Sequence, residues 1–278
     1  MIRGFAPGKF ILSGEHAVVY GHRAVAAAVS RGTTVTLRAR PGPSGIEQSA
    51  LVDPRLWPAL ATLVPAEGIG VSIASDLPVG AGMGSSAALA VALVRALAAW
   101  EGREATFAEC HERAFAVERV FHGTPSGIDH TVSAMGGVVR YRKREPPEAL
   151  LLPRPVHLVV ANTGTPGDTA AMVAGVRARN PVAKLRRIGA VAEMVAARLV
   201  RGEDVGPLFS ENHRLLRGIA VSTPALDAMC AAMEAAGATG AKLAGAGGGG
   251  VAIAAVTEDT VERVRVAVGG FTVIIGGA

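Results

Sequence analysis

Three glycines at alternate positions stand directly before a helical sequence in the stretch DLPVGAGMGSSAAL, residues 76–89. Glycine has no side chain, so its backbone N–H group can approach a ligand closely and its φ can be positive. In front of a helix, such N–H groups and the positive end of the helix dipole suit an anion, and phosphate is the natural one. The stretch therefore predicts a phosphate-binding turn that ends in Ser85 and Ser86.

Phosphate binding competes with three simpler roles for this stretch: a tight turn, a flexible linker, and a close crossing of two backbones. A linker is disfavoured because strand and helix signals flank the stretch at once, and a plain turn needs only one or two glycines. The stretch lacks the lysine of GxxxxGK[ST] and also the spacing of the dinucleotide fingerprint. If phosphate binds here, the hydroxyl oxygen of Ser86 is a hard donor that suits Mg²⁺.

Glu118 is the most informative single acidic residue. A helix is predicted from Thr106, which forms a capping box with Glu109, to about Phe121. The apolar stripe of this helix consists of Phe107, Cys110, Ala114, Val117 and Phe121. At 100° per residue Glu118 falls on or beside that buried face, where a carboxylate needs a partner. A salt bridge with an arginine and a metal ion are both open.

Two further stretches and one lysine carry candidate chemistry. In HGTPSGIDH, Asp129 follows Ser126 by three residues, so it either completes a capping box or acts as an acid or base. Lys9 follows Pro-Gly in a chain with only four lysines; a strand-end lysine is usually solvated. KLAGAGGGG, residues 242–250, holds five glycines within six residues, which suggests a backbone pressed against something flat or charged.

The elements that must position these residues alternate between strands and helices without a strict βαβ repeat, which favours an α+β fold in two halves. In the first half we expect strands in IRGFA and KFILSGEH with a turn at Pro7-Gly8, then strands in TTVTLRAR, VSIAS and GGVVRYR. A helix capped by Ser85 or Ser86 runs to near Gly102. The proline-rich REPPEALLLPRP is the predicted domain boundary, which gives domains 1–152 and 153–278.

The second half begins with a strand in VHLVVANTG. Helical patterns follow at about 170–179, 183–201, 206–217 and 223–236. The chain closes with AKLAGAGGGGVAIAAV, a short helix and FTVIIGG.

Composition narrows the class of protein. Half of the 278 residues are hydrophobic, which indicates a globular chain, and no apolar run reaches the roughly 20 residues that span a bilayer. The N-terminus has no signal-peptide pattern, so a cytoplasmic location is the expectation. Dispersed arginines and few aromatics argue against nucleic acid. Cys110 and Cys230 are expected to be two buried, reduced thiols.

Four motifs stand in order: PGKFILSGEHAVVYG, LPVGAGMGSSAAL, HGTPSGIDHTVS and KLAGAGGGG. Together with ANTGTPGDTAAMVAGVR they resemble the GHMP kinase superfamily, and its mevalonate kinase branch in particular, from Pro7 to about Gly250. The resemblance implies an N-terminal half like ribosomal protein S5 domain 2, a ferredoxin-like C-terminal half, and an active site in a cleft between them. It also implies ATP as co-substrate, Mg²⁺ as cofactor and mevalonate as the phosphorylated alcohol.

The resemblance assigns roles residue by residue. Asp129 maps onto the catalytic aspartate and Lys9 onto the lysine that pairs with it. Ser86 and Glu118 map onto the Mg²⁺ ligands. The residues assigned to the ATP phosphates are Gly80, Ala81, Gly82, Met83, Gly84, Ser85 and Ser86. The residues assigned to mevalonate are Glu15, His16, Thr169, Gly245 and Ala246.

Departures and rivals accompany this resemblance. Ala244 stands where the family usually has threonine, and Gly164 and Gly167 replace bulkier or basic residues. The closest rival is another kinase of the superfamily, for phosphomevalonate, homoserine or a sugar. A non-catalytic ligand sensor of the same fold is a rival from another class, but it predicts loss of Lys9, Glu118 or Asp129. The sequence leaves the oligomeric state open and is compatible with a homodimer.

Overall fold

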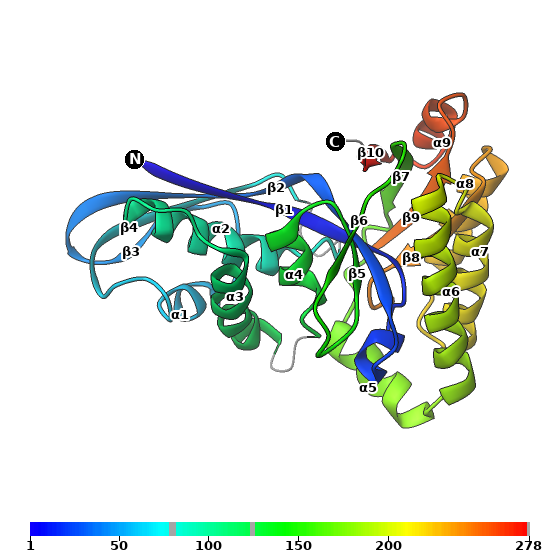
Figure 1. Ribbon diagram of the computed structural model, residues 1–278, viewed down its shortest axis with the longest axis horizontal. Coiled ribbons are helices and arrows are strands. Elements are labelled where there is room, and N and C mark those ends of the chain that lie inside the picture. The colour runs from blue at the N-terminus through cyan, green and yellow to red at the C-terminus, as the bar shows by residue number, and fades with distance from the viewer. Residues whose placement is uncertain (78–81, 123–125, 277–278) are drawn as a thin grey trace. The chain divides into compact units, whose positions relative to one another are not determined.

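The computed structural model describes residues 1–77, 82–122 and 126–276, and its elements are shown in Figure 1. The chain divides into two compact units. The first unit consists of Met1–Lys9, Ser30–Val79 and Met83–Gly136, and the second of Phe10–Val29, Gly80–Gly82 and Gly137–Ala278. Strands β1 (Ile2–Ser13) and β2 (Ala24–Pro43) contribute residues to both units.

The first unit packs helices against a sheet. β4 (Glu67–Ser75) pairs antiparallel with β2, from Thr33 opposite Ser75 to Ala39 opposite Ile69, and β3 (Gly45–Ser49) runs parallel to β4. In the part of β2 that pairs with β4, Thr33, Val35 and Leu37 are buried and the residues between them are less so, which is the pattern of a sheet with one covered face. The helices of this unit are α1 (Leu56–Leu60), α2 (Ser85–Trp100), α3 (Phe107–His122) and α4 (Ile128–Met135).

Helix α2 is the centre of the first unit's core. Its alanines and leucines are buried almost all round, as expected for a helix that contacts both the sheet and the helices α3 and α4. Gly4 of β1 lies against the backbone of Ala92 and Ala96, where a side chain has no room. Cys110 of α3 joins the same core as a free, buried thiol, and Cys230 is likewise free and buried in the second unit, as predicted.

Three local predictions for the first unit need correction. β1 runs without interruption through Pro7-Gly8, where a turn was expected. Helix α2 has Gly84 as its N-cap, in the left-handed conformation, so Ser85 and Ser86 are its first residues and not its cap. Phe107 was assigned to the buried stripe of α3 but is 41% exposed. The Thr106 hydroxyl does accept a bond from the Glu109 amide at 3.2 Å, as the capping box predicts.

The second unit contains a four-stranded antiparallel sheet in the order β10-β7-β9-β8. Its strands are β7 (Val156–Asn162), β8 (Gly240–Ala244), β9 (Val251–Val256) and β10 (Phe271–Ile275). Its helices are α5 (Thr169–Arg179), α6 (Val182–Arg201), α7 (Gly206–Gly218), α8 (Pro224–Ala235) and α9 (Val261–Ala267). With helices between β7 and β8 and between β9 and β10, this is the ferredoxin-like arrangement that was expected.

A smaller sheet region also belongs to the second unit. The Ala24–Ala27 part of β2 pairs with β5 (Val138–Tyr141), which pairs with β6 (Glu148–Leu150). β6 thus lies inside the proline-rich segment that was predicted as the boundary, and the last change of compact unit along the chain falls after Gly136. The short 3-10 helix η1 (Ala17–Tyr20) follows β1 and contacts α6. The division of the family domains at residue 152 remains a prediction.

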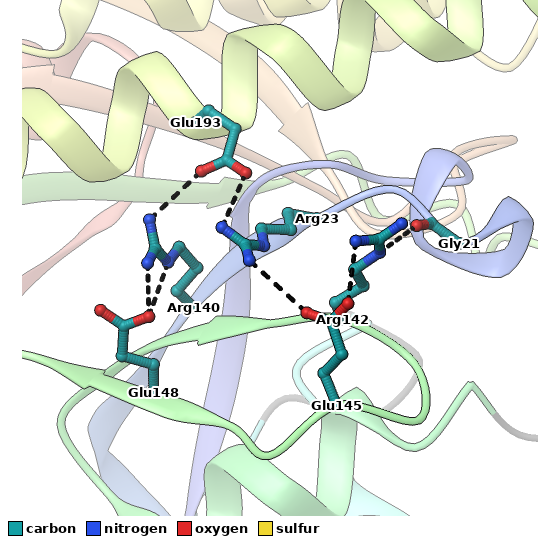
Figure 2. A network of polar contacts seen from close by, with 7 residues as sticks. All are labelled: Gly21, Arg23, Arg140, Arg142, Glu145, Glu148 and Glu193. Atoms are coloured by element: carbon teal, nitrogen blue, oxygen red, sulfur yellow. Dashed lines mark hydrogen bonds and ion pairs between the residues drawn. The ribbon is translucent and has the colours of Figure 1, made fainter.

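A network of arginines and glutamates holds this region to α6 (Figure 2). Its charged members are Arg23, Arg140, Arg142, Glu145, Glu148 and Glu193. Glu193 of α6 pairs with Arg23 at 3.2 Å and with Arg140 at 3.4 Å. The Nε of Arg142 donates to the carbonyl oxygen of Gly21 at 2.7 Å. All of these charged side chains are partly exposed.

Candidate active site

The first unit brings Lys9 and Asp129 together. Lys9 lies within β1 and is only 3% exposed, and its Nζ is 3.2 Å from Oδ1 of Asp129 at the start of α4. A cation that is buried in this way is stabilised by the carboxylate, and the carboxylate is held in one orientation. Asp129 keeps a side chain that is 32% exposed. The pair therefore offers a fixed, reachable carboxylate beside a fixed positive charge.

Glu118 is the second acidic group of this unit. Its residue is 2% exposed, and among the described residues its Oε1 has no hydrogen-bond partner. Burial, with a smaller contribution from the charge of Asp129, raises the pKa of the Glu118 carboxyl to about 7. A hydrogen bond with Ser86 and the charge of Lys9 act in the opposite direction and lower this pKa. The sequence left open an arginine or a metal ion as the partner of this carboxylate. Within the described part of the chain, Glu118 forms no salt bridge with an arginine. An unmet carboxylate oxygen beside a serine hydroxyl is a donor set that fits a hard cation.

Only part of the predicted phosphate turn can be placed. Gly80 and Ala81 lie outside the described residues. The carbonyl oxygen of Met83 accepts a bond from the Lys9 amide at 2.9 Å, and Gly84 adopts φ +70°. A Cβ on Gly84 would lie 3.0 Å from Cε of Lys9, so glycine lets the lysine side chain pass. Gly82, also at positive φ, belongs to the second unit.

Ser85 and Ser86 open helix α2 in the first unit. Their amides are among the first N–H groups of the helix, which point out of its N-terminus. The start of α2 is thus suited to an anion, and Ser86 there is hydrogen-bonded to Glu118 of α3. The geometry agrees with a phosphate and a cation held next to each other.

In the second unit, His16 has an unusual backbone. Its φ of 59° and ψ of −44° are rare for a residue with a side chain, and the residue is 6% exposed. Its Nε2 lies 2.8 Å from the carbonyl oxygen of Ala246, in the glycine-rich KLAGAGGGG segment. Burial lowers the pKa of His16, opposed by the Ala246 bond and the charge of Glu15.

Glu15 is buried more deeply than a substrate-binding residue needs to be. It is 1% exposed, and its two carboxylate oxygens are bound by protein groups, Oε1 by Nζ of Lys242 and Oε2 by Nδ2 of Asn212 at 2.9 Å. The prediction that it binds mevalonate remains a prediction, but the surroundings of its carboxylate are those of a structural ion pair.

The other predicted substrate residues of the second unit lie at the start of a helix and on the loop after β8. Thr169 is the exposed first residue of α5, whose N-cap Asp168 accepts a bond from the Ala171 amide at 2.9 Å. Gly245, at φ +97°, has open space where a Cβ would stand, and it precedes the Ala246 that binds His16.

The glycines of KLAGAGGGG have a packing reason. Gly247 and Gly249 have positive φ and lie against the carbonyl groups of Val221 and Thr165, so side chains have no room there. Gly167, one of the two departures from the family pattern, is pressed in turn against the carbonyl oxygen of Gly247. Gly164, the other departure, has φ +75° and open space around it.

Asn212 and Lys242 are fully buried polar residues for which the sequence predicted no role. Asn212 lies on α7 with Leu208, Phe209 and Leu216 as buried neighbours on the same face. The helical-face argument that singled out Glu118 could therefore have found Asn212 as well. Lys242 carries no such signal, because strand β8 is buried throughout and only the fold shows its partner.

No cluster of three or more His, Cys, Asp or Glu side chains that could hold a metal occurs among the described residues. In the same part of the chain, no helix combines the length and the hydropathy needed to cross a membrane.

Comparison with known proteins identifies the family of the chain. The model described as "GHMP kinases N terminal domain" matches residues 55–137, and "GHMP kinases C terminal" matches residues 194–272. The mevalonate kinase of Thermococcus gammatolerans is 37% identical, over 92% of this chain and 90% of that protein. The crystal structure of L. major mevalonate kinase in complex with R-mevalonate has a TM-score of 0.87 and 26% identity, covering 100% of this chain and 97% of the other.

The fold and the site together define a two-domain small-molecule kinase. The chain belongs to the GHMP kinase family, and its sequence relatives within that family are mevalonate kinases. A phosphomevalonate kinase from Streptococcus pneumoniae, with a TM-score of 0.85 but 17% identity, shares the fold alone. The fold by itself therefore does not select the alcohol that is phosphorylated.

Proposed function

We propose that this protein transfers the γ-phosphoryl group of ATP to the C5 hydroxyl of mevalonate. The observation that carries the proposal is the Lys9–Asp129 pair beside the unmet carboxylate of Glu118, on a chain 37% identical to a mevalonate kinase. Phosphoryl transfer needs mainly in-line positioning and neutralisation of charge, and fixed groups of both signs supply these.

Asp129 is the group that handles the acceptor hydroxyl. Its exposed carboxylate can accept the hydroxyl's hydrogen bond and take its proton as the oxygen attacks. Lys9 holds that carboxylate in place and adds a positive charge next to the developing alkoxide. Both roles, removal of the proton by Asp129 and stabilisation of the alkoxide by Lys9, are compatible with the pair.

Residues 80–86 are assigned to the phosphates, with the amides at the start of α2 as donors. Ser86 and Glu118 are the residues that would hold Mg²⁺, since one has a hydroxyl oxygen and the other an unmet carboxylate oxygen. When bound, the cation would supply positive charge that neutralises the phosphates of the nucleotide. His16, Thr169, Gly245 and Ala246 are the remaining candidates for contact with mevalonate. A cytoplasmic location and a homodimer remain predictions.

The experiment that tests this function is an ADP-release assay with mevalonate, phosphomevalonate, homoserine and galactose as separate acceptors. We expect turnover with mevalonate that exceeds the other three by at least about 100-fold in kcat/KM, well below the roughly 10⁴-fold that a matched hydrogen-bonding site can supply. Equal or higher turnover with another acceptor would assign the protein to a different kinase of the family. Nucleotide binding with no turnover on any of the four would support the ligand-sensor alternative.

A further inference from the structure

A cluster of three buried polar side chains lies in the second unit: Glu15, Asn212 and Lys242. The Nζ of Lys242 contacts Oε1 of Glu15 and also lies 3.3 Å from the carbonyl oxygen of Ile11 and 2.6 Å from that of Leu243. These contacts use the three donors of an ammonium group. The ammonium group of Lys242 therefore has no donor left for a ligand.

The glutamate end of the cluster is equally occupied. Asn212 donates to Oε2 of Glu15 at 2.9 Å, and the glutamate is 1% exposed. A residue that binds a soluble substrate needs an exposed polar atom, whereas the carboxylate of Glu15 faces protein donors on both oxygens. Burial lowers the pKa of Lys242, and the adjacent Glu15 opposes this. A charge so deeply buried persists only because its partner is present.

The cluster lies next to a residue with a strained backbone. His16 follows Glu15 directly, with its φ of 59° and ψ of −44°. On the other side, the carbonyl oxygen of Glu15 accepts a bond from the Ala17 amide at 2.6 Å. Backbone strain of this kind persists only where the surroundings fix it, and the buried side chain of Glu15 is the anchor nearest to it.

The GEH segment and the KLAGAGGGG segment are linked twice. Glu15 binds Lys242 and His16 binds the carbonyl oxygen of Ala246, four residues further along the second segment. Two links in parallel define the orientation of the imidazole relative to the glycine-rich loop better than one. If the Glu15–Lys242 ion pair were lost, the only one of these two links left would be the contact between the His16 ring and the carbonyl oxygen of Ala246.

We propose that Glu15, Lys242 and Asn212 are positioning residues, which fix the backbone of His16 and thereby the acceptor-binding loop, and that Glu15 itself does not contact the substrate. The part that concerns the acceptor rests on the proposed function. The part that concerns His16 does not, because it can be observed without any substrate.

The first test is the NMR spectrum of the histidine rings in ¹⁵N-labelled protein, with the His16 signals identified by a His16→Gln variant. Lys242→Met should shift or broaden the His16 signals, because the neighbouring anchor is lost. The matched control is Lys184→Met, which removes an exposed lysine that donates to the carbonyl oxygen of Gly218, and should leave the His16 signals unchanged. An unchanged His16 spectrum in folded Lys242→Met protein overturns the proposal.

Because Lys242→Met alone leaves a buried carboxylate without its cation, the double variant Glu15→Gln/Lys242→Met provides a neutral pair of similar size. It should fold where a single variant does not, and should still show altered His16 signals. His16 signals identical to the wild type in this double variant also overturn the proposal.

The second test compares kinetics over the same variants with mevalonate as the acceptor. Each single variant should lower kcat/KM for mevalonate by about 10- to 100-fold through KM, with a smaller change in the KM for ATP. If both act through one pair, the double variant should lose no more than the worse single variant. Losses that multiply in the double variant, or a KM for mevalonate that only Glu15→Gln changes, would show direct contact and overturn the proposal. A change at His16 without turnover on mevalonate would refute the proposed function and leave the positioning role standing.

Discussion

Glu118 of the first unit and Glu15 of the second unit are two buried glutamates with opposite surroundings. Their exposed fractions are 2% and 1%, yet Glu15 has a protein donor at each carboxylate oxygen, and Oε1 of Glu118 has none among the described residues. Burial of an acid is therefore not what marks a ligand site. The unmet oxygen marks it, because a buried charge without a partner is costly unless a bound cation completes it.

Glu15→Gln should give the largest loss of stability, because it leaves the fully buried Lys242 without a counter-ion. We expect the free energy of unfolding to fall by about 3–5 kcal/mol, whereas Glu118→Gln, which changes a carboxylate with one unmet oxygen, should cost less than about 0.5 kcal/mol or stabilise. Urea denaturation without Mg²⁺ or nucleotide measures both. Equal losses for the two variants would remove the distinction between the glutamates.

His130 shows that a buried polar group of the first unit can lack a hydrogen-bond partner without being a ligand site. The residue is fully buried, and neither ring nitrogen has a hydrogen-bond partner among the described residues, but its ring lies edge-on to that of His111 with centroids 4.7 Å apart. Burial, with a smaller effect of His111, lowers the pKa of His130 to about 4. We interpret it as a neutral core histidine and not as a ligand.

The acid sensitivity of the fold follows from this pKa. The unfolded chain binds a proton at His130 near pH 6.5 and the folded chain only near 4, so the stability from this group is complete above 6.5 and is lost as the pH falls toward 4. The loss amounts to about 3 kcal/mol at most. His130→Phe should flatten this part of the stability curve between pH 6.5 and 4. A curve of unchanged slope would mean that His130 is not buried neutral.

Glu118→Gln should reduce activity and leave stability alone. Loss of the carboxylate should lower kcat by about 100-fold at a fixed Mg²⁺ concentration, or about 2.7 kcal/mol, and raise the Mg²⁺ concentration needed for half-maximal rate. Steady-state rates over a Mg²⁺ titration measure both. Glu112→Gln, an exposed acid on the same helix, is the matched control. An unchanged Mg²⁺ dependence would show that Glu118 serves the fold only.

The arginine network of Figure 2 should give the smallest effect, although it contains more ion pairs than the Glu15 cluster. Its charges are partly exposed, so water already stabilises them and screens their attraction. Arg140→Gln should cost less than about 1 kcal/mol in urea denaturation, and less again at high salt. A loss as large as that of Glu15→Gln would mean that exposure does not set the energy of ion pairs in this unit.

The fold could be predicted in its outline from periodicity and turn residues, and the four helices of residues 169–235 agree closely with the expected ranges. The prediction was wrong where a local turn signal was outweighed by strand pairing. Pro7-Gly8 indicates a turn, but proline tolerates an extended backbone, and pairing with β2 continues the strand.

More of the candidate site could be predicted from the sequence in the first unit than in the second. Glu118 was found because a helix displays its period in the sequence. Lys242 and Asn212 could not be paired with Glu15, because 227 and 197 positions separate them along the chain and no local pattern encodes such a contact. The glycine motifs predicted the loops. Only the fold showed that the carboxylate of Glu15 has protein donors on both oxygens, whereas Oε1 of Glu118 has none among the described residues.

The central claim is that Asp129, held by Lys9, acts on the acceptor hydroxyl. The most direct measurement is ADP release by Asp129→Asn with saturating mevalonate and ATP·Mg²⁺, with nucleotide affinity measured by calorimetry on the same protein. The account predicts a kcat lower by about 10³-fold or more and a Kd for the nucleotide within about threefold of the wild type. A variant that turns over at near wild-type rate would contradict it.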